Sequence, residues 1–215
     1  EYLNKINVFP VPDSDTGTNM AFTLNAVLDG TSTKVCNSIS DMLFNIADSA
    51  LDGARGNSGA ILAQFFQGMS DGCKNSTKMT PEEFAQAIKI GSEYAREALG
   101  EPREGTILTI LTDFSNHLIT EIKNGKTDFL ELFNSAVKVS EISLKNTPNQ
   151  LKVLKKAGVV DAGAQGFVDL LHGIQKFIKD GNIKKLDFSS VLKNTTHSNH
   201  YIESDATDLT YRYCT

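Results

Sequence analysis

Two aspartates stand one residue apart, Asp13 and Asp15, in the stretch "NVFPVPDSDTGTNM". Carboxylate oxygens are hard ligands of the kind that Mg²⁺ prefers when phosphates complete its shell. A calcium loop of the EF-hand type is excluded, because the sixth position from Asp13 is Thr18 and the twelfth is Leu24. A phosphatase motif of the D-x-D-x-T type is disfavoured, because its fifth position is Gly17 and the prolines of "VFPVP" break any preceding central strand.

Two more glycine-rich breaks, "GARGNSG" at 53–59 and "GVVDAGAQG" at 158–166, precede helical patterns in the same way. The N-terminus of a helix exposes unpaired N–H groups and a partial positive charge, which suits phosphate binding. For one such loop alone, an ordinary helix cap is the commoner explanation. Three in one chain favour a phosphate site, although "GARGNSG" lacks the Lys-Ser or Lys-Thr pair of a Walker A motif.

Arg55 lies in the second of these breaks, and the sequence favours neither of two interpretations of its role. A guanidinium group beside a phosphate-binding loop would neutralise phosphate charge. The same side chain could instead form a surface ion pair with Asp52, a contact that contributes little to stability.

The elements that must position these loops are helices, because apolar residues recur at helical period along most of the chain. Three stretches carry helix-start signals: "TPEEF" with Thr80 as cap, "DFLE" from Asp128, and "TPNQ" from Thr147. The pattern predicts an all-α fold of seven or eight helices, with no convincing strand before residue 200. Helices are expected over 20–28, 39–50, 61–69, 84–98, 107–122, 129–144, 151–156 and 166–178.

Composition narrows the classes of function. A net charge of -5 argues against a nucleic-acid binder, which would carry a basic stripe. Three cysteines in no paired spacing suggest neither disulfides nor zinc, so a reducing cytoplasm is expected. No apolar run approaches the roughly 20 residues of a membrane span, so membrane insertion is not expected. The start at Glu1 and the final "LTYRYCT" predict a fragment of a longer chain.

Four stretches in order, "NVFPVPDSDTGTNM", "GARGNSGAILAQFFQG", "REGTILT" and "GVVDAGAQG", resemble the signatures of the nucleotide-binding domain of the fatty acid kinase A family. That domain is similar to the DhaL-type ATP-binding subunit of dihydroxyacetone kinases, and the resemblance spans nearly all of 2–185. It implies an antiparallel eight-helix barrel with a shortened first helix, and ATP with two Mg²⁺ ions at one rim. The resulting boundaries are 1–190 for the kinase domain and 191–215 for a linker and the start of a following, partly β domain.

The resemblance also assigns roles to residues. Asp13 and Asp15 would bind metal and act in catalysis with Arg55, and Asn7 would be a third, weaker metal ligand where dihydroxyacetone kinases carry an aspartate. Ser14 stands where the family usually has glycine, and we expect the loop to tolerate it. Nucleotide contacts would come from Thr16, Thr18 and Asn19 at the phosphates, from the cradle Gly56, Asn57, Ser58 and Gly59, and from Thr106, Asp161, Ala162 and Gly163 around the base and sugar.

The implied reaction is phosphoryl transfer from ATP to the carboxylate of a fatty acid that a separate fatty-acid-binding protein presents. A carboxylate is ionised at pH 7, so the step needs no general base, and positioning with charge neutralisation supplies the catalysis. A dihydroxyacetone kinase subunit, whose hydroxyl acceptor needs activation, is the alternative enzyme. A non-catalytic nucleotide-binding module is the alternative outside enzymes, because binding and catalysis use the same loops. The full-length protein is expected to be a homodimer.

Overall fold

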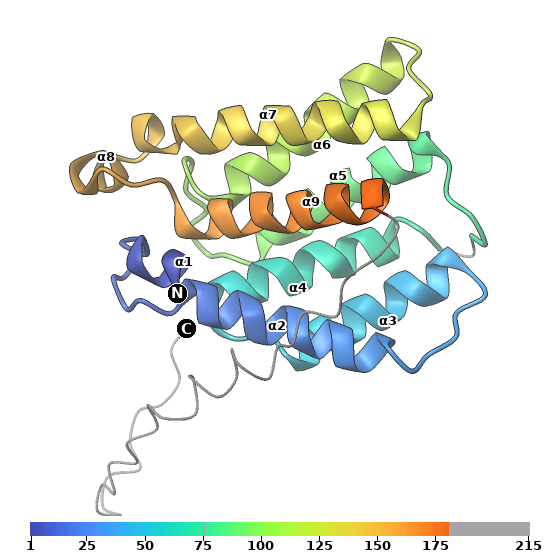
Figure 1. Ribbon diagram of the computed structural model, residues 1–215, viewed down its shortest axis with the longest axis horizontal. Helices are drawn as coiled ribbons and strands as arrows, with labels where there is room; N and C mark the ends of the chain where they lie inside the picture. The colour runs from blue at the N-terminus through green and yellow to red at the C-terminus, as the bar shows by residue number, and fades with distance from the viewer. Residues whose placement is uncertain (75, 181–215) are drawn as a thin grey trace, which may run out of the picture. The chain divides into compact units, whose positions relative to one another are not determined.

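The computed structural model describes residues 1–74 and 76–180, and within them every regular element is an α-helix (Figure 1). The predicted all-α fold is confirmed. Residues 1–176 form one compact unit, and none of the described helices is long and apolar enough to cross a bilayer. The predicted boundary at 190 and the segment 191–215 lie outside the described residues. The helices are α1 Tyr2–Lys5, α2 Thr16–Thr31, α3 Ile39–Asp52, α4 Gly56–Asp71, α5 Pro81–Glu97, α6 Ile107–Lys123, α7 Phe129–Gln150, α8 Lys152–Ala157 and α9 Ala162–Asp180.

Two of the three predicted helix starts are confirmed by their capping bonds. Thr80 Oγ1 accepts from the Glu83 N–H at 3.2 Å, and Glu83 Oε2 accepts from the Thr80 N–H at 2.8 Å, which completes a capping box. Asp128 Oδ1 accepts from the Glu131 N–H at 2.8 Å. These caps use residues three apart, so the local sequence is sufficient to specify them.

The third predicted start, "TPNQ", is wrong, because α7 continues through Thr147 to Gln150 with Pro148 inside the helix. Pro148 has no N–H, so the carbonyl of Leu144 loses its usual partner four residues on. The Thr147 hydroxyl replaces that partner and donates to the Leu144 carbonyl at 2.8 Å. The proline is tolerated because its neighbour repairs the hydrogen bond that it removes.

The glycine-rich breaks are themselves the first turns of helices. Helix α2 begins at Thr16 and α4 at Gly56, inside the stretches that the sequence treats as loops. Helix α9 begins at Ala162 and not at Gly166, because Asp161 accepts from the Ala164 N–H at 2.8 Å and caps the helix four residues early. Most of the residues assigned to the nucleotide therefore lie on helix ends, whereas Asn7 and Asp13 lie in the segment between α1 and α2.

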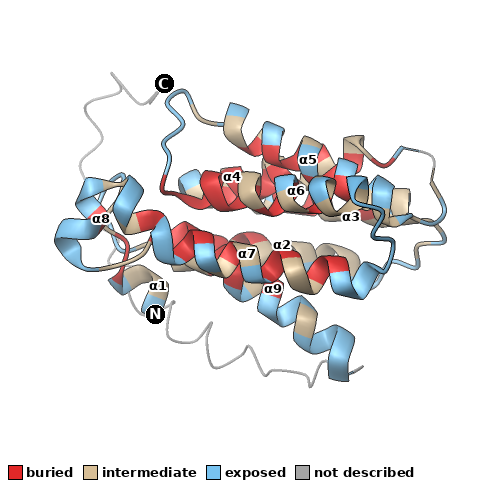
Figure 2. Cartoon of the chain, turned by 90° about the horizontal axis from the view of Figure 1, so that it is seen from above, coloured by how far each residue is buried: buried red, intermediate tan, exposed pale blue. Residues whose placement is uncertain are grey.

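Helices that follow one another in sequence pack side by side from α2 to α7, and α9 packs among them (Figure 1). Phe167 of α9 has its ring centroid 5.6 Å from that of Phe65 in α4 and 6.1 Å from that of Phe114 in α6, both edge-on. Burial concentrates on the central helices α4 and α6 (Figure 2). The continuous burial of α6 from Ile107 to Leu111 is explained by this central position. The N-terminal ends of α2, α4, α6 and α9 gather at one end of the unit (Figure 1).

Candidate functional site

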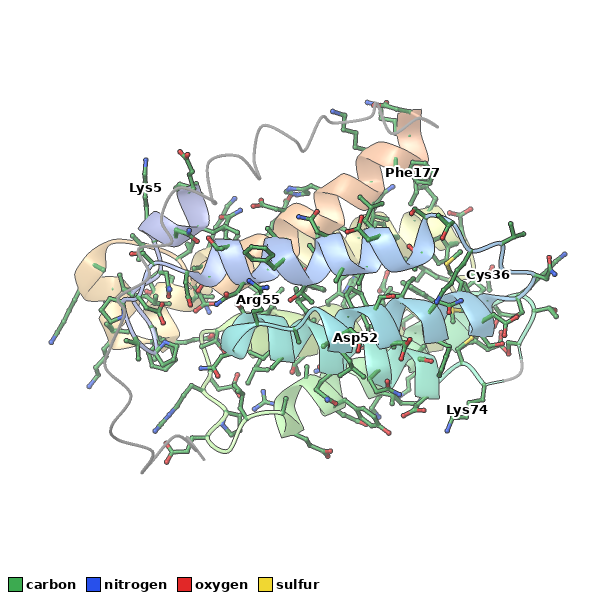
Figure 3. All side chains as sticks on the ribbon, turned by 90° about the horizontal axis from the view of Figure 1, so that it is seen from below. Lys5, Cys36, Asp52, Arg55, Lys74 and Phe177 are labelled. Atoms are coloured by element: carbon green, nitrogen blue, oxygen red, sulfur yellow. The ribbon has the colours of Figure 1, made fainter. Side chains whose placement is uncertain are left out.

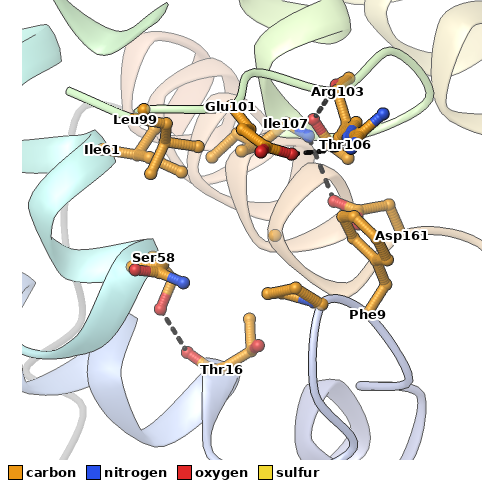
Figure 4. A pocket seen from close by; sticks show the side chains of 14 residues that line it. Phe9, Thr16, Ser58, Ile61, Leu99, Glu101, Arg103, Thr106, Ile107 and Asp161 are labelled. Atoms are coloured by element: carbon orange, nitrogen blue, oxygen red, sulfur yellow. Dashed lines mark hydrogen bonds and ion pairs between the residues drawn. The ribbon is translucent and has the colours of Figure 1, made fainter. Parts of the chain in front are cut away.

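A cavity of about 400 Å³ opens where these four helix N-termini meet (Figure 4). Most of its polar lining comes from the first turns or caps of the helices and belongs to the sequence motifs, and the loop before α6 adds two charged residues. Because the residues come from four separate stretches, the predicted grouping of distant motifs around one site is realised in space. The predicted residues that line the cavity are Thr16, Asn57, Ser58, Thr106, Asp161 and Gly163.

The apolar walls of the cavity were not among the predicted site residues. They are formed by Phe9, Ile61, Leu99 and Ile107. Pockets that bind flat organic groups combine such walls with a few placed polar atoms. Phe9, Ile61 and Ile107 stand inside the quoted motifs and could have been found there, whereas no pattern distinguishes Leu99 from a residue of the core.

Asp161 joins two helix N-termini at the base of the cavity. Its Oδ2 accepts from the N–H groups of Ala164 in α9, at 2.8 Å, and Ile107 in α6, at 3.1 Å. Its own N–H donates to the Thr147 hydroxyl at 3.2 Å. The residue is 5% exposed, and burial raises the pKa of its carboxyl from 3.8 to about 6, against the opposing effect of the backbone N–H bonds. Asp161 therefore ties α6, α7 and α9 together beside the cavity.

Thr106 is the N-cap of α6 and is also buried beside the cavity. Its hydroxyl donates to the Arg103 carbonyl at 2.7 Å and accepts from the Leu108 N–H at 3.4 Å. At the mouth, an Arg103 guanidinium nitrogen lies 2.7 Å from a Glu101 carboxylate oxygen (Figure 4). The loop before α6 is thus fastened by its own hydrogen bonds. Arg103 begins the quoted stretch "REGTILT" and could have been found there, whereas Glu101 belongs to no quoted motif.

The predicted cradle of α4 divides into residues that face the cavity and residues that serve packing. Asn57 and Ser58 line the cavity. Gly56 has φ +56, a conformation that favours glycine, and a Cβ there would lie 2.4 Å from Asn19 Nδ2, so the Asn19 side chain would have to move. A Cβ on Gly59 would lie 2.6 Å from the Thr23 hydroxyl oxygen, which shows that this glycine allows α4 to approach α2.

Arg55 precedes α4 and lies between α2 and α4 (Figure 3). Its guanidinium carbon is 4.0 Å from the centroid of the Phe22 ring, a cation–π contact. Among the described residues it forms no ion pair, so the pairing with Asp52 is not present. The side chain is exposed and its charge is available to a ligand.

The carboxylates of the first motif lie at the start of α2 with an amide beside them. Asn7 is 4% exposed and donates from Nδ2 to Asp13 Oδ1 at 2.6 Å. Its Oδ1 is buried and has no hydrogen-bond partner. An unpaired buried acceptor costs about 1–3 kcal/mol, and a divalent cation beside it would remove that cost. Asp15 is the N-cap of α2, but its side chain accepts none of the helix N–H groups.

The oxygen atoms of Asn7, Asp13 and Asp15 suit a magnesium ion whose coordination shell is completed by phosphates. The described residues contain no group of three or more His, Cys, Asp and Glu side chains able to hold a metal. Mg²⁺ is usually held by one or two carboxylates together with substrate phosphates, so a full protein cage is not required. Asp13, Asp15 and the unpaired oxygen of Asn7 would supply the protein's share.

Thr18 and Asn19, the remaining predicted phosphate contacts, are engaged inside the protein. The Thr18 N–H donates to Asn4 Oδ1 at 3.1 Å, and Asn4 Nδ2 donates to the Thr18 hydroxyl at 2.8 Å. Asn19 packs its amide against Gly56, and Ala162 is buried and absent from the cavity lining. Asn4 was missed by the sequence analysis, because no short-range pattern links it to a partner 14 residues away.

Comparisons with known proteins identify a family and several relatives. The family described as DAK2 domain matches residues 10–176. An uncharacterized protein of Staphylococcus saprophyticus is 36% identical over all of this chain, and uncharacterized proteins of Staphylococcus epidermidis and Staphylococcus aureus are each 34% identical over the same extent. The chain spans 39% of the length of each of these curated relatives.

Proposed function

The chain belongs to the DAK2 domain family, and we propose that it transfers the γ-phosphoryl group of ATP to the carboxylate of a fatty acid held by a separate binding protein. DAK2 domains are ATP-binding phosphoryl-transfer domains that use Mg²⁺. One observation carries the proposal: Thr16 lines the cavity and directly follows Asp15 in the chain, so the carboxylate motif begins next to the lining of the cavity. That continuity suits a nucleotide whose phosphates extend toward a cation.

In the proposed step an oxygen of the acyl carboxylate attacks the γ-phosphorus, the bond from that phosphorus to the bridging oxygen breaks, and ADP leaves with the electron pair. The products are ADP and an acyl phosphate. The attacking group is already ionised, so no side chain has to remove a proton. His117 bonds to Ser135 at 2.9 Å and His172 to Glu141 at 2.7 Å, and neither histidine lines the cavity.

The chain's own residues would orient the triphosphate. Asn57 and Ser58 line the cavity from the first turn of α4, where N–H groups have no partner within the helix and the helix dipole is positive, which suits a phosphate. Two bound Mg²⁺ ions would neutralise charge on the transferring phosphoryl group. Arg55, held on the Phe22 ring, would add a positive charge near the same helix start.

The test uses the full-length protein, ATP, Mg²⁺ and a lipid-loaded fatty-acid-binding protein, with ADP release and hydroxylamine capture of acyl phosphate as readouts. We expect both signals together. Release of ADP with dihydroxyacetone alone would establish the hydroxyl-directed kinase instead. Binding of ATP with no ADP release on any acceptor would establish a nucleotide-binding module.

A matched pair of variants controls the assay. Asp15→Ala should lower turnover by about 100-fold or more, because a metal-binding carboxylate is removed from the transferring phosphates. Asp29→Ala, an exposed aspartate on the same helix, should leave turnover unchanged. Equal activity of the two variants would contradict the metal role of Asp15.

A further inference from the structure

Asn4 closes a two-bond ring with the first turn of α2. Its Oδ1 accepts from the Thr18 N–H, and its Nδ2 donates to the Thr18 hydroxyl. Thr18 is the third residue of the helix, and the N–H groups of the first turn have no partner within the helix itself. Asn4 therefore caps α2 from outside, through a residue that α1 supplies.

The residue that normally makes this capping bond is the N-cap, and here that residue is Asp15. An N-cap aspartate usually accepts from the N–H of the second or third helical residue. In this structure the third N–H is already taken by Asn4, and the Asp15 side chain makes no capping bond. We propose that Asn4 is a positioning residue for the cation site: by capping α2 in place of Asp15, it keeps the Asp15 carboxylate free to bind Mg²⁺.

The seat of α1 on α2 shows that this contact is built into the fold. A Cβ on Gly17 would lie 2.8 Å from Leu3 Cβ and 2.9 Å from Asn4 Oδ1. The glycine of "DTG" is therefore required for the approach of α1. Leu3 also packs against the core and lies 3.1 Å from where a Gly166 Cβ would stand, which ties α1 to α9 as well.

The same segment reaches the other carboxylate. Asn7 follows α1 directly and donates to Asp13, while Asn4 bonds to Thr18 on the far side of Asp15. Both ends of the loop that carries the two aspartates are thus held by amides three residues apart. If Asn4 lost its amide, the Thr18 N–H would need an acceptor, and the side chain of the N-cap residue, here Asp15, is the group that usually supplies one. Capping and cation binding would then compete for one carboxylate.

This inference rests on the proposed role of Asp15 at the cation, and its test compares Asn4→Ala with Lys5→Ala in the full-length protein. Lys5 is the next residue on α1 and projects away from the other helices (Figure 3). Binding of Mn²⁺, as a paramagnetic substitute for Mg²⁺, is measured in the presence of ADP. Loss of a residue that orients a metal ligand typically costs about 10–100-fold in metal affinity. We expect Asn4→Ala to bind Mn²⁺ about tenfold more weakly and Lys5→Ala to bind it with unchanged affinity. The KM of Asn4→Ala for Mg²⁺ should rise by a matching factor, with kcat preserved at saturating Mg²⁺.

Two further variants separate positioning from simple stability. Asn4→Asp retains an acceptor for the Thr18 N–H, and the Thr18 hydroxyl can turn to donate, so it should restore most of the Mn²⁺ affinity. In EDTA, the thermal midpoint of the Asn4→Ala, Asp15→Ala double variant should fall by more than the sum of the two single changes, because neither cap then remains.

The outcomes distinguish this inference from the proposed function. Unchanged Mn²⁺ affinity in Asn4→Ala, with Asp15→Ala strongly impaired, would make Asn4 a purely structural residue and overturn the inference. Unchanged Mn²⁺ affinity in Asp15→Ala would instead overturn the cation site itself. Additive changes in the EDTA midpoints would contradict the exchange of caps between Asn4 and Asp15.

Discussion

Two tripeptides of the same pattern begin helices in this molecule, and they use their aspartates in opposite ways. Asp15-Thr16-Gly17 opens α2, and Asp161-Ala162-Gly163 opens α9. Asp161 is buried and accepts N–H bonds from two helices, whereas Asp15 is partly exposed and accepts none from its own helix. The glycine at 17 makes room for α1, whereas a Cβ at Gly163 would stand 3.3 Å from Asp161 Oδ2 and in ordinary contact with Ile107 of α6.

The neighbour explains the difference. Helix α6 presents the Ile107 N–H to Asp161, and Oδ2 of that carboxylate accepts this bond together with the one from Ala164. Helix α1 presents the Asn4 amide to α2, which satisfies the helix and leaves Asp15 unoccupied. A carboxylate at a helix N-terminus is therefore structural when donors surround it, and available for a ligand when another residue has taken those donors.

The largest effect that tests this comparison is the difference in stability between the alanine variants of the two aspartates. Asp161→Ala leaves the N–H groups of Ile107 and Ala164 buried without an acceptor. We expect the free energy of unfolding to fall by about 2–4 kcal/mol. Asp15→Ala, measured by urea denaturation in EDTA, should change it by no more than about 0.5 kcal/mol. An equal loss in both variants would show that Asp15 also supports the fold.

The pH dependence of stability sharpens the comparison next. Burial raises the pKa of Asp161 from 3.8 to about 6 in the folded state, so between these values the folded protein holds a proton that the unfolded chain has lost. The contribution of Asp161 to stability is therefore greatest below pH 3.8 and declines as pH rises through 6, by about 3 kcal/mol in all. D161N cannot titrate at this position and does not share this decline. The free energy of unfolding of D161N relative to that of the wild type should therefore rise by this amount from pH 4 to 7. A constant difference would contradict the burial of a titrating carboxyl.

The sequence predicts features that depend on near neighbours and misses those that depend on distant ones. The caps at Thr80 and Asp128 are confirmed, because each bonds to a residue three positions on. The false start at Thr147 arises because its hydroxyl instead repairs the bond lost at Pro148 and accepts from Asp161. Local propensity cannot anticipate a partner brought near by folding.

The candidate site follows the same division. The resemblance to a family whose signature stretches follow in the same order placed Ser58, Thr106 and Asp161 in one site, and all three line the cavity. The apolar wall at Leu99 has no such signal, because an apolar residue that lines a cavity has the same composition as one in the core. The Asn4 contact joins two segments through an amide, and its role became visible only through the atoms that Thr18 uses.

The smallest effect concerns the left-handed residue that directly precedes Asp15. Ser14 stands there at φ +58, a conformation in which glycine is unstrained, as Gly158 shows at φ +68 after α8. A left-handed conformation costs a residue with a Cβ about 1–2 kcal/mol. Glycine avoids this cost but loses more backbone entropy on folding, which offsets part of the gain. Ser14→Gly should therefore raise the free energy of unfolding by about 0.5–1 kcal/mol, with Mn²⁺ affinity unchanged. Ser32→Gly, at φ -61 after α2, should instead lower it slightly. A loss of stability in Ser14→Gly would mean that the Ser14 side chain itself holds the aspartates in place.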